Sequence, residues 1–163
     1  MAEVEAAVDI PAPLADVWDL YFDPQRWAAW VDGFASVASS SGYPEAGGTL
    51  SWRSTPAGRG DVTERVLEHE PRRLHRVAFT DPGAEGELEV RFEMVPGGEA
   101  DRRTRVSQRL SYRLSSGGPL RAITDRLFIR AQMRGSIERS LAELRTEAEA
   151  GRPSGPPPPA AGR

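Results

Sequence analysis

Few residues in this chain could carry acid–base or nucleophilic chemistry. There are two histidines, His69 and His75, and neither cysteine nor lysine. Thiolate nucleophiles, cysteine-bound metals and lysine Schiff bases are therefore excluded. Two histidines also give little material for a histidine metal site or a Ser-His-Asp triad. We expect no metal and no cofactor.

One of the two histidines is predicted to point into the interior. In the predicted strand Leu74–Thr80, His75 alternates onto the same face as Val77 and Phe79, whereas His69 lies beside a turn and is expected to face solvent. His75 is thus the candidate proton shuttle if a ring closure or dehydration takes place here. The alternative is a structural histidine whose hydrogen bonds are satisfied within the fold.

A second predicted strand, Arg103–Ser115, places two more polar groups inward. Gln108 and Tyr112 share a face with Val106 and Leu110, opposite an outer row of arginines. A buried amide or phenol needs a hydrogen-bonding partner, so both residues are candidates to contact a ligand, with Tyr112 as the donor to a carbonyl. The same positions also suit structural residues that are bonded within the fold.

Aromatic residues supply candidates for an apolar binding surface. Trp18 and Trp30 fit core packing, Trp52 in mid-strand fits core or cavity equally, and Trp27 is expected to be partly exposed at a cavity entrance. Four further residues could face a ligand or extend the core: Phe79 and Phe92 on strands, and Phe128 and Gln132 on the last helix.

The charge pattern argues against several partners. All 21 basic residues are arginine and the net charge is −3, without a clustered positive excess, so nucleic acid is not expected. Arg53, Arg91 and Arg105 could clamp a carboxylate or a phosphate, but alternation sets Arg91 and Arg105 on an outer, solvated face. The N-terminus is acidic and no apolar run approaches about 18 residues, so we expect a cytoplasmic protein without stable membrane insertion.

A sheet and helices must position these residues. Apolar residues on even positions from Val4 to Ile10 predict a first strand; Leu14 begins a short helix, and Asp23-Pro24 begins a second that ends at Gly33. Turn signals, with Arg59-Gly60-Asp61 interpreted as one of them, then separate six alternating runs. These predicted strands are Phe34–Ser41, Thr49–Thr55, Asp61–Glu68, Leu74–Thr80, Glu87–Val95 and Arg103–Ser115. In Glu87–Val95, the residues predicted to point inward are Leu88, Val90, Phe92 and Met94.

The chain is predicted to end in one long helix and a tail. From Leu120 to about Ala150 only Gly135 interrupts the helical pattern, and one apolar stripe runs along it. Residues 151–163 are rich in proline, glycine and alanine and are predicted to be disordered, which leaves residues 1–150 as one domain. The stripe comprises Leu120, Ile123, Leu127, Ile137, Leu141 and Leu144.

Short motifs follow one another in an order that resembles a known family. They are Ile10-Pro-Ala-Pro leading into Val17-Trp18, then Asp23-Pro24 and Trp30, Glu68-His-Glu-Pro71, Thr104-Arg-Val106 and Ser140-Leu-Ala-Glu-Leu144. Over about residues 2–148, the chain is similar to the START-like superfamily of polyketide cyclases and lipid-transfer domains.

The resemblance implies both a fold and a class of function. The implied fold is α+β: a helix-grip fold in which a seven-stranded curved antiparallel sheet wraps around the long C-terminal helix, with two short helices after the first strand and a cavity between sheet and helix. The implied function is binding of a small hydrophobic molecule, such as a lipid, an isoprenoid or a polyketide-like compound. A polyketide aromatase/cyclase is the alternative and a protein-interaction module the third reading, because one fold serves many activities.

Overall fold

The computed structural model describes residues 1–56, 58–97, 102–115 and 122–151, and for residues 122–127 only the backbone. Apart from Gly151, the predicted tail lies outside the described residues. The elements follow the predicted order: β1 (Ala2–Ile10), α1 (Leu14–Tyr21), the 3₁₀ turn η1 (Pro24–Arg26), α2 (Trp27–Trp30), β2 (Phe34–Ser41), β3 (Thr49–Ser54), β4 (Asp61–Glu70), β5 (Leu74–Thr80), β6 (Ala84–Val95), β7 (Arg103–Leu114) and α3 (Ala122–Ala150).

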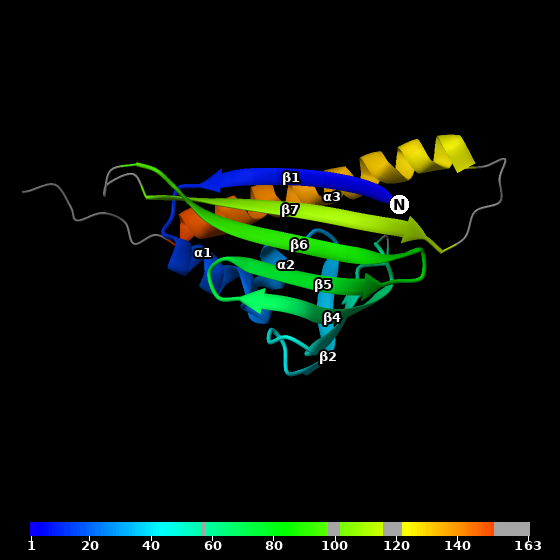
Figure 1. The fold of residues 1–163 in the computed structure, drawn as a ribbon, viewed down its shortest axis with the longest axis horizontal. Coiled ribbons are helices and arrows are strands. Elements are labelled where there is room, and N and C mark those ends of the chain that lie inside the picture. Colours follow the sequence, from blue (N-terminus) through cyan, green and yellow to red (C-terminus); the bar gives the residue numbers. More distant parts are fainter. Residues whose placement is uncertain (57, 98–101, 116–121, 152–163) are drawn as a thin grey trace, which may run out of the picture.

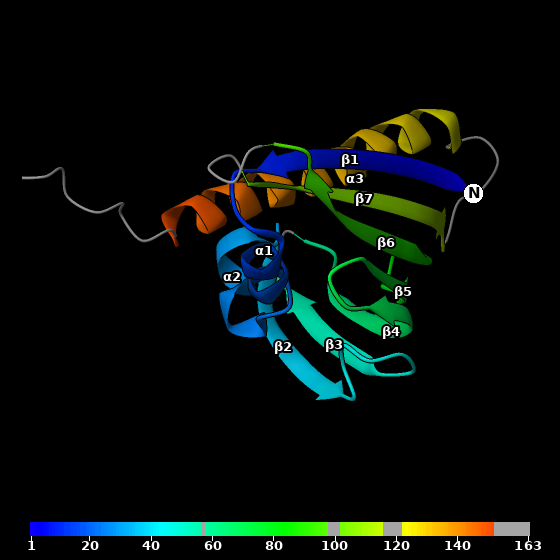
Figure 2. The same cartoon turned by 60° about the vertical axis from the view of Figure 1, so that its left-hand side comes forward.

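All seven strands form one antiparallel sheet in the order β1-β7-β6-β5-β4-β3-β2. Strands β2 to β7 form a meander, and β1 returns to pair with β7, where Ala2 lies opposite Tyr112 and Ile10 opposite Thr104. The sheet curves, and α3 runs beside β1 and β7 on its concave side (Figures 1 and 2). The predicted helix-grip architecture is therefore confirmed.

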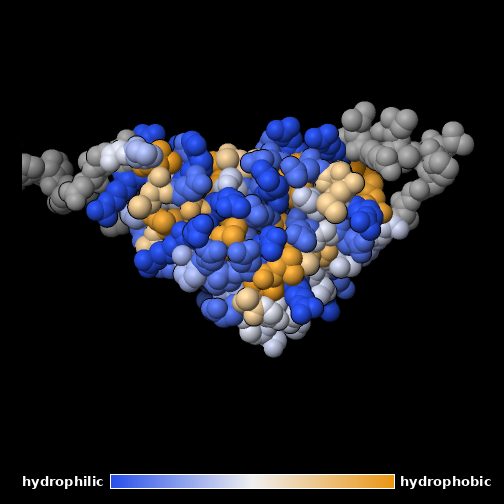
Figure 3. All heavy atoms as spheres, in the orientation of Figure 1, coloured by the Kyte–Doolittle hydropathy of each residue, from blue (hydrophilic) through white to orange (hydrophobic). Residues whose placement is uncertain are grey.

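Alternation along the strands separates a dry face from a charged one. Val90 and Phe92 on β6 are buried, and so is Val106 on β7. The residues adjacent to each of them in its strand face outward. Arg105 donates to both carboxylate oxygens of Asp9, at 2.7 and 3.0 Å, and Arg91 donates to Glu89 at 2.7 Å. The outer placement predicted for these two arginines is confirmed, and this face is mostly hydrophilic (Figure 3).

One inward assignment on β6 was wrong. Met94 leaves 76% of its surface exposed, although it shares the parity of Val90 and Phe92. It lies one residue from the end of β6, which ends at Val95. Alternation gives the direction of a side chain but not the extent of the layer above it.

Helix α3 covers the sheet with the C-terminal half of the predicted stripe. Ile137, Leu141 and Leu144 are buried, while Leu120 and the side chains of Ile123 and Leu127 lie outside what is described. At 1.5 Å per residue, the 29 residues of α3 span about 44 Å. Among the described residues, no helix is both long and apolar enough to cross a membrane.

The two short helices cover the remaining part of the concave side. Asp23 accepts a hydrogen bond from the backbone N–H of Gln25 at 3.0 Å, with Pro24 at the first position, as predicted. The second helix is one 3₁₀ turn followed by α2, and it ends at Trp30 instead of Gly33 because Val31 is already extended. Trp27 and Trp30, the first and last residues of α2, are both buried.

Gly86 allows β6 and β7 to approach closely, and its replacement gives a stability test. A Cβ at position 86 would lie 2.0 Å from the carbonyl oxygen of Ser111 and 2.8 Å from the Cα of Tyr112. We expect Gly86→Ala to lower the free energy of unfolding by more than about 2 kcal/mol, since the backbone itself must shift. Urea unfolding would measure this difference.

Gly83→Ala is the matched control for that test. A Cβ there meets nothing closer than the Asp81 carboxylate at 3.7 Å, so the change should stay within about 0.5 kcal/mol. Equal effects of the two substitutions would contradict the close strand approach at Gly86.

Candidate functional site

A cavity of about 120 Å³ lies between the concave face of the sheet and the three α-helices. Every strand except β1 contributes to its lining. The lining residues are Tyr21, Trp27, Trp30, Val31, Asp32, Phe34, Tyr43, Trp52, Arg59, Glu64, His75, Val77, Leu88, Gln108, Leu110, Ser136, Ile137 and Ser140.

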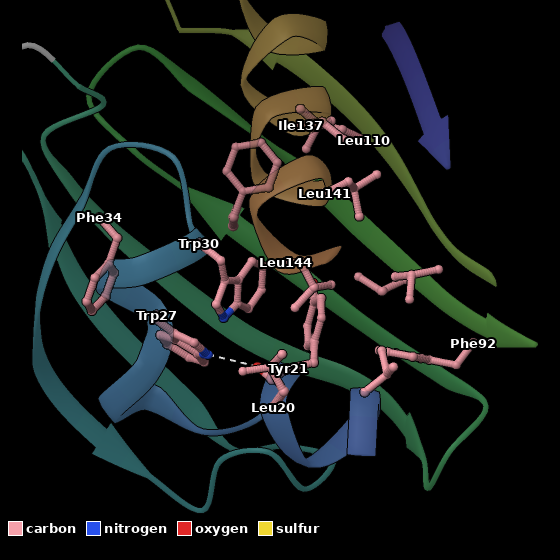
Figure 4. Packing of buried hydrophobic residues seen from close by; sticks show 14 of the residues in the cluster. Leu20, Tyr21, Trp27, Trp30, Phe34, Phe92, Leu110, Ile137, Leu141 and Leu144 are labelled. Atoms are coloured by element: carbon pink, nitrogen blue, oxygen red, sulfur yellow. Dashed lines mark hydrogen bonds between the residues drawn. The ribbon is translucent and has the colours of Figure 1, made fainter. Parts of the chain in front are cut away.

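An aromatic wall, made of Trp27, Trp30, Phe34, Tyr43 and Trp52, forms much of this lining. The Trp27 ring centroid lies 5.7 Å from Phe34 and 5.9 Å from Tyr43, and Phe34 lies 5.8 Å from Trp52. The Trp27 indole N–H donates to the Tyr21 carbonyl at 2.8 Å (Figure 4), but the buried Trp30 Nε1 has no partner. The wall is thus apolar with one unused donor.

Glu64 of β4 brings a carboxylate into the cavity. Its Oε1 accepts a hydrogen bond from Trp52 Nε1 at 2.9 Å. The carboxylate keeps some accessible surface because it opens onto the cavity, yet protein surrounds it, and this burial raises the pKa of Glu64. Glu64 was not among the residues predicted from the sequence, although Val62, Glu64 and Val66 share one parity and both valines are buried.

Two phenols share the cavity with this carboxylate. Gln108 Nε2 donates to the Tyr21 hydroxyl oxygen at 3.0 Å, which gives the buried amide the partner that its inward position required. Burial raises the pKa of Tyr21 and that of Tyr43, and the negative charge of Glu64 adds to both effects. Both hydroxyls therefore stay protonated and can serve as neutral donors.

The two histidines form a pair at one side of the cavity. Their Nδ1 atoms are 3.0 Å apart, and the buried His75 Nε2 has no partner. Burial lowers the pKa of His75 to about 3, with a contribution from His69, so the ring is neutral near pH 7. The expectation that His69 faces solvent was wrong, since its ring also packs 5.2 Å from both Trp18 and Phe22.

Arg59 reaches the cavity from the turn between β3 and β4. Its Nε donates to Asp81 Oδ2 at 2.7 Å, and its guanidinium lies 4.6 Å from the centre of the Phe79 ring. From the sequence, this residue was predicted only as part of a turn. The turn is present, with Gly60 at φ +83°, but the arginine side chain folds back against the interior.

The structure divides the predicted site residues into three groups. Trp27, Trp30, Trp52, His75 and Gln108 line the cavity, and Trp27 is buried instead of partly exposed at an entrance. Their contact with a ligand stays a prediction. The residues that are buried but do not line the cavity are Phe79, Phe92 and Tyr112, and those that are exposed on α3 are Phe128, at 70%, and Gln132.

A cluster centred on Asp32 joins the segment after α2 to α3. Asp32 accepts from Ser136 Oγ at 2.7 Å and from both Arg139 Nη2 and Nε, at 2.9 and 3.1 Å. Its backbone N–H donates to Ser140 Oγ at 2.9 Å. Asp32, Ser136 and Ser140 all line the cavity, so this Asp32 cluster fastens two of its walls together.

Known proteins share both sequence features and the fold with this chain. Residues 1–149 match the model of the family described as "Polyketide cyclase / dehydrase and lipid transport". Among curated proteins, none gives a significant match.

Three solved structures show the same fold. The Zhui aromatase/cyclase from Streptomyces sp. R1128 is 19% identical with a TM-score of 0.68, over 91% of this chain and 93% of that one. TTHA0849 from Thermus thermophilus is 24% identical with a TM-score of 0.64, over 91% and 98%. The Aha1 dimer from Colwellia psychrerythraea is 15% identical with a TM-score of 0.63, over 94% and 100%.

The Asp32 cluster leads to a pH-dependent stability prediction. The hydrogen bonds from Arg139 hold the pKa of Asp32 below its usual value, and the bond from Ser136 lowers it further. This stabilisation is complete above the unfolded-state pKa of about 4 and is lost as the pH falls through the folded-state pKa. We expect Asp32→Asn to cost about 1–2 kcal/mol of unfolding free energy at neutral pH, with a smaller difference near pH 3.

Urea unfolding of both proteins at the two pH values would test this. Asp61→Asn is the control, because Asp61 is 80% exposed and its Arg53 partner lies at 3.6 Å, so removing its charge should change little. A cost for Asp32→Asn that is the same at both pH values would contradict the assigned role of the charge.

Proposed function

The chain belongs to the polyketide cyclase / dehydrase and lipid transport family, and from this membership and the cavity we propose that it binds a small, largely apolar molecule between sheet and helices. The observation that carries the proposal is that two buried neutral polar atoms, Trp30 Nε1 and His75 Nε2, lack hydrogen-bonding partners and belong to residues that line the cavity. Each such atom costs about 1–3 kcal/mol when left unbonded, which a polar atom on a ligand would recover. Arg59 Nη2 also lacks a hydrogen-bonding partner, although it is ion-paired with Asp81.

The size of the cavity limits the ligand in this conformation. A volume of about 120 Å³ is close to that of an engineered cavity that takes up benzene, roughly 150 Å³, and below the roughly 300–1,000 Å³ of most ligand sites. One ring with a short substituent fits. A larger lipid or polyketide-like compound would require the walls to separate, and the Asp32 cluster is a set of contacts that would have to break.

Native mass spectrometry of the freshly purified protein tests the binding proposal. We expect a co-purified molecule, or a complex after addition of a single-ring compound such as benzyl alcohol, with a change in tryptophan emission from the aromatic wall. Val77→Phe should abolish both signals, because Val77 lines the cavity and is 1% exposed, so the added ring must occupy that space.

Val37→Phe is the matched control, since Val37 is 37% exposed on β2 and does not line the cavity. Absence of any complex with the unmodified chain, or binding that Val77→Phe leaves intact, would contradict the proposal.

A second candidate function is catalysis on a polyketide-like substrate. It is favoured by the acid–base groups that meet in the cavity, namely Glu64, neutral His75 and the Tyr21–Gln108 pair. The fold shared with an aromatase/cyclase is compatible with it. Tyr112 was predicted as the donor to a carbonyl, but it does not line the cavity. The phenols that do are Tyr21 and Tyr43, and we assign this role to Tyr21, whose hydroxyl oxygen accepts from Gln108.

Product analysis with a poly-β-ketone thioester would test this candidate. We expect His75→Ala to reduce cyclised product by at least about tenfold, in the range of general acid–base effects, and by more than it weakens single-ring binding. Tyr112→Phe should leave product formation unchanged because Tyr112 does not line the cavity. Equal activity in the His75 variant and the unmodified chain would contradict an acid–base role.

A further inference from the structure

We propose that the ligand presents a protonated amine to Glu64, so that the cavity selects single-ring amines over the corresponding alcohols and acids. This inference rests on the proposed binding function and names the ligand class for it. It follows from the charges around the cavity, from the aromatic rings near Glu64, and from the neutral indole N–H that is the hydrogen-bonding partner of its carboxylate.

The other charged groups at the cavity are already paired. Arg59 is engaged by Asp81, whose side chain is 4% exposed, and Asp32 is engaged by Arg139 and Ser136. His75 on β5 is neutral near pH 7. Glu64 has the Trp52 indole N–H as its hydrogen-bonding partner, which is a neutral donor. Among the described lining residues, Glu64 is therefore the acid without a cation in a direct ion pair.

The surroundings of Glu64 suit a cation better than they suit an anion. Trp52 touches its carboxylate, and the aromatic wall continues from Trp52 through Phe34 and Trp27 to Tyr43. The π-faces of such rings attract an organic cation, with gains of about 0.5–2 kcal/mol per contact. A ligand carboxylate would instead meet the charge of Glu64 in a site of low dielectric constant.

The unpaired carboxylate makes amine binding depend on protons. The titratable groups around Glu64 are Tyr21 on α1, Tyr43 between β2 and β3, Arg59 between β3 and β4, and His75 on β5. Burial favours the neutral form of Glu64 and raises its pKa. The positive charge of Arg59 lowers this pKa, but it is the smallest of the three effects on it. A bound ammonium stabilises the ionised carboxylate. Amine affinity should therefore fall as the pH drops through the pKa that Glu64 has in the protein without ligand.

Three probes of nearly equal size test the inference: benzylamine, benzyl alcohol and benzoate, titrated against the full chain by tryptophan emission and calorimetry. At neutral pH we expect benzylamine to bind at least about tenfold more tightly than benzyl alcohol, and benzoate to be the weakest. As the pH falls from neutral through the raised pKa of Glu64, benzylamine should weaken while benzyl alcohol stays constant.

Glu64→Gln separates the charge from the shape of the site. Its amide oxygen can still accept from Trp52 Nε1, so the fold and benzyl alcohol binding should persist, while the preference for benzylamine and its pH dependence disappear. Glu143→Gln, at an exposed position of α3, is the matched control and should behave as the unmodified chain.

The outcomes separate this inference from the proposal on which it rests. Binding of benzyl alcohol as tight as that of benzylamine, or an amine preference that survives in Glu64→Gln, would overturn the amine assignment and leave a neutral-ligand cavity. Failure of all three probes to bind would overturn the binding function itself and the amine assignment with it.

Discussion

The concave face of one curved sheet has to be covered, and two separate parts of the chain cover it. Helix α3 lies along β1 and β7, while α1 and α2 cover the other region and contact α3 where the two covers meet (Figure 2). The Asp32 cluster joins these covers, with Arg139 and Ser136 on α3 bonded to the segment after α2. The cavity lies beneath this junction, so the fold's main packing problem also sets the position of its candidate site.

The polar groups around the cavity are better suited to a ligand site than to a packed core. A core of this kind would be more stable with its polar atoms bonded or replaced by apolar groups, because each unbonded buried atom carries a cost. Here Trp30 and His75 each keep an unbonded nitrogen, and Glu64 keeps a carboxylate among aromatic rings. Neutral phenols and an Arg59 that is paired with Asp81 surround that carboxylate, so Glu64 has no cation in a direct ion pair.

The sequence predicted the architecture more fully than the site. Alternation and turn signals identified all six strands of the meander, and the inward assignments of His75 and Gln108 were correct. Strand parity gives the direction of a side chain but not what lies above it: Met94 is exposed near the end of β6, and Tyr112 is buried as predicted but does not line the cavity. Phe128, on α3, is exposed. Glu64 was missed because a charged residue between valines is usually assigned to solvent, and Arg59 because a turn does not determine where its side chain folds.

The most direct test of the central claim, that the cavity is the ligand site, is to follow the indole N–H signals of the four tryptophans by NMR as a single-ring amine is added. We expect Trp30, whose Nε1 has no partner, and Trp52, bonded to Glu64, to shift most strongly. Trp18, which packs against Phe22 and Phe92 and does not line the cavity, should shift least. Shifts confined to Trp18, or none at all, would contradict the claim.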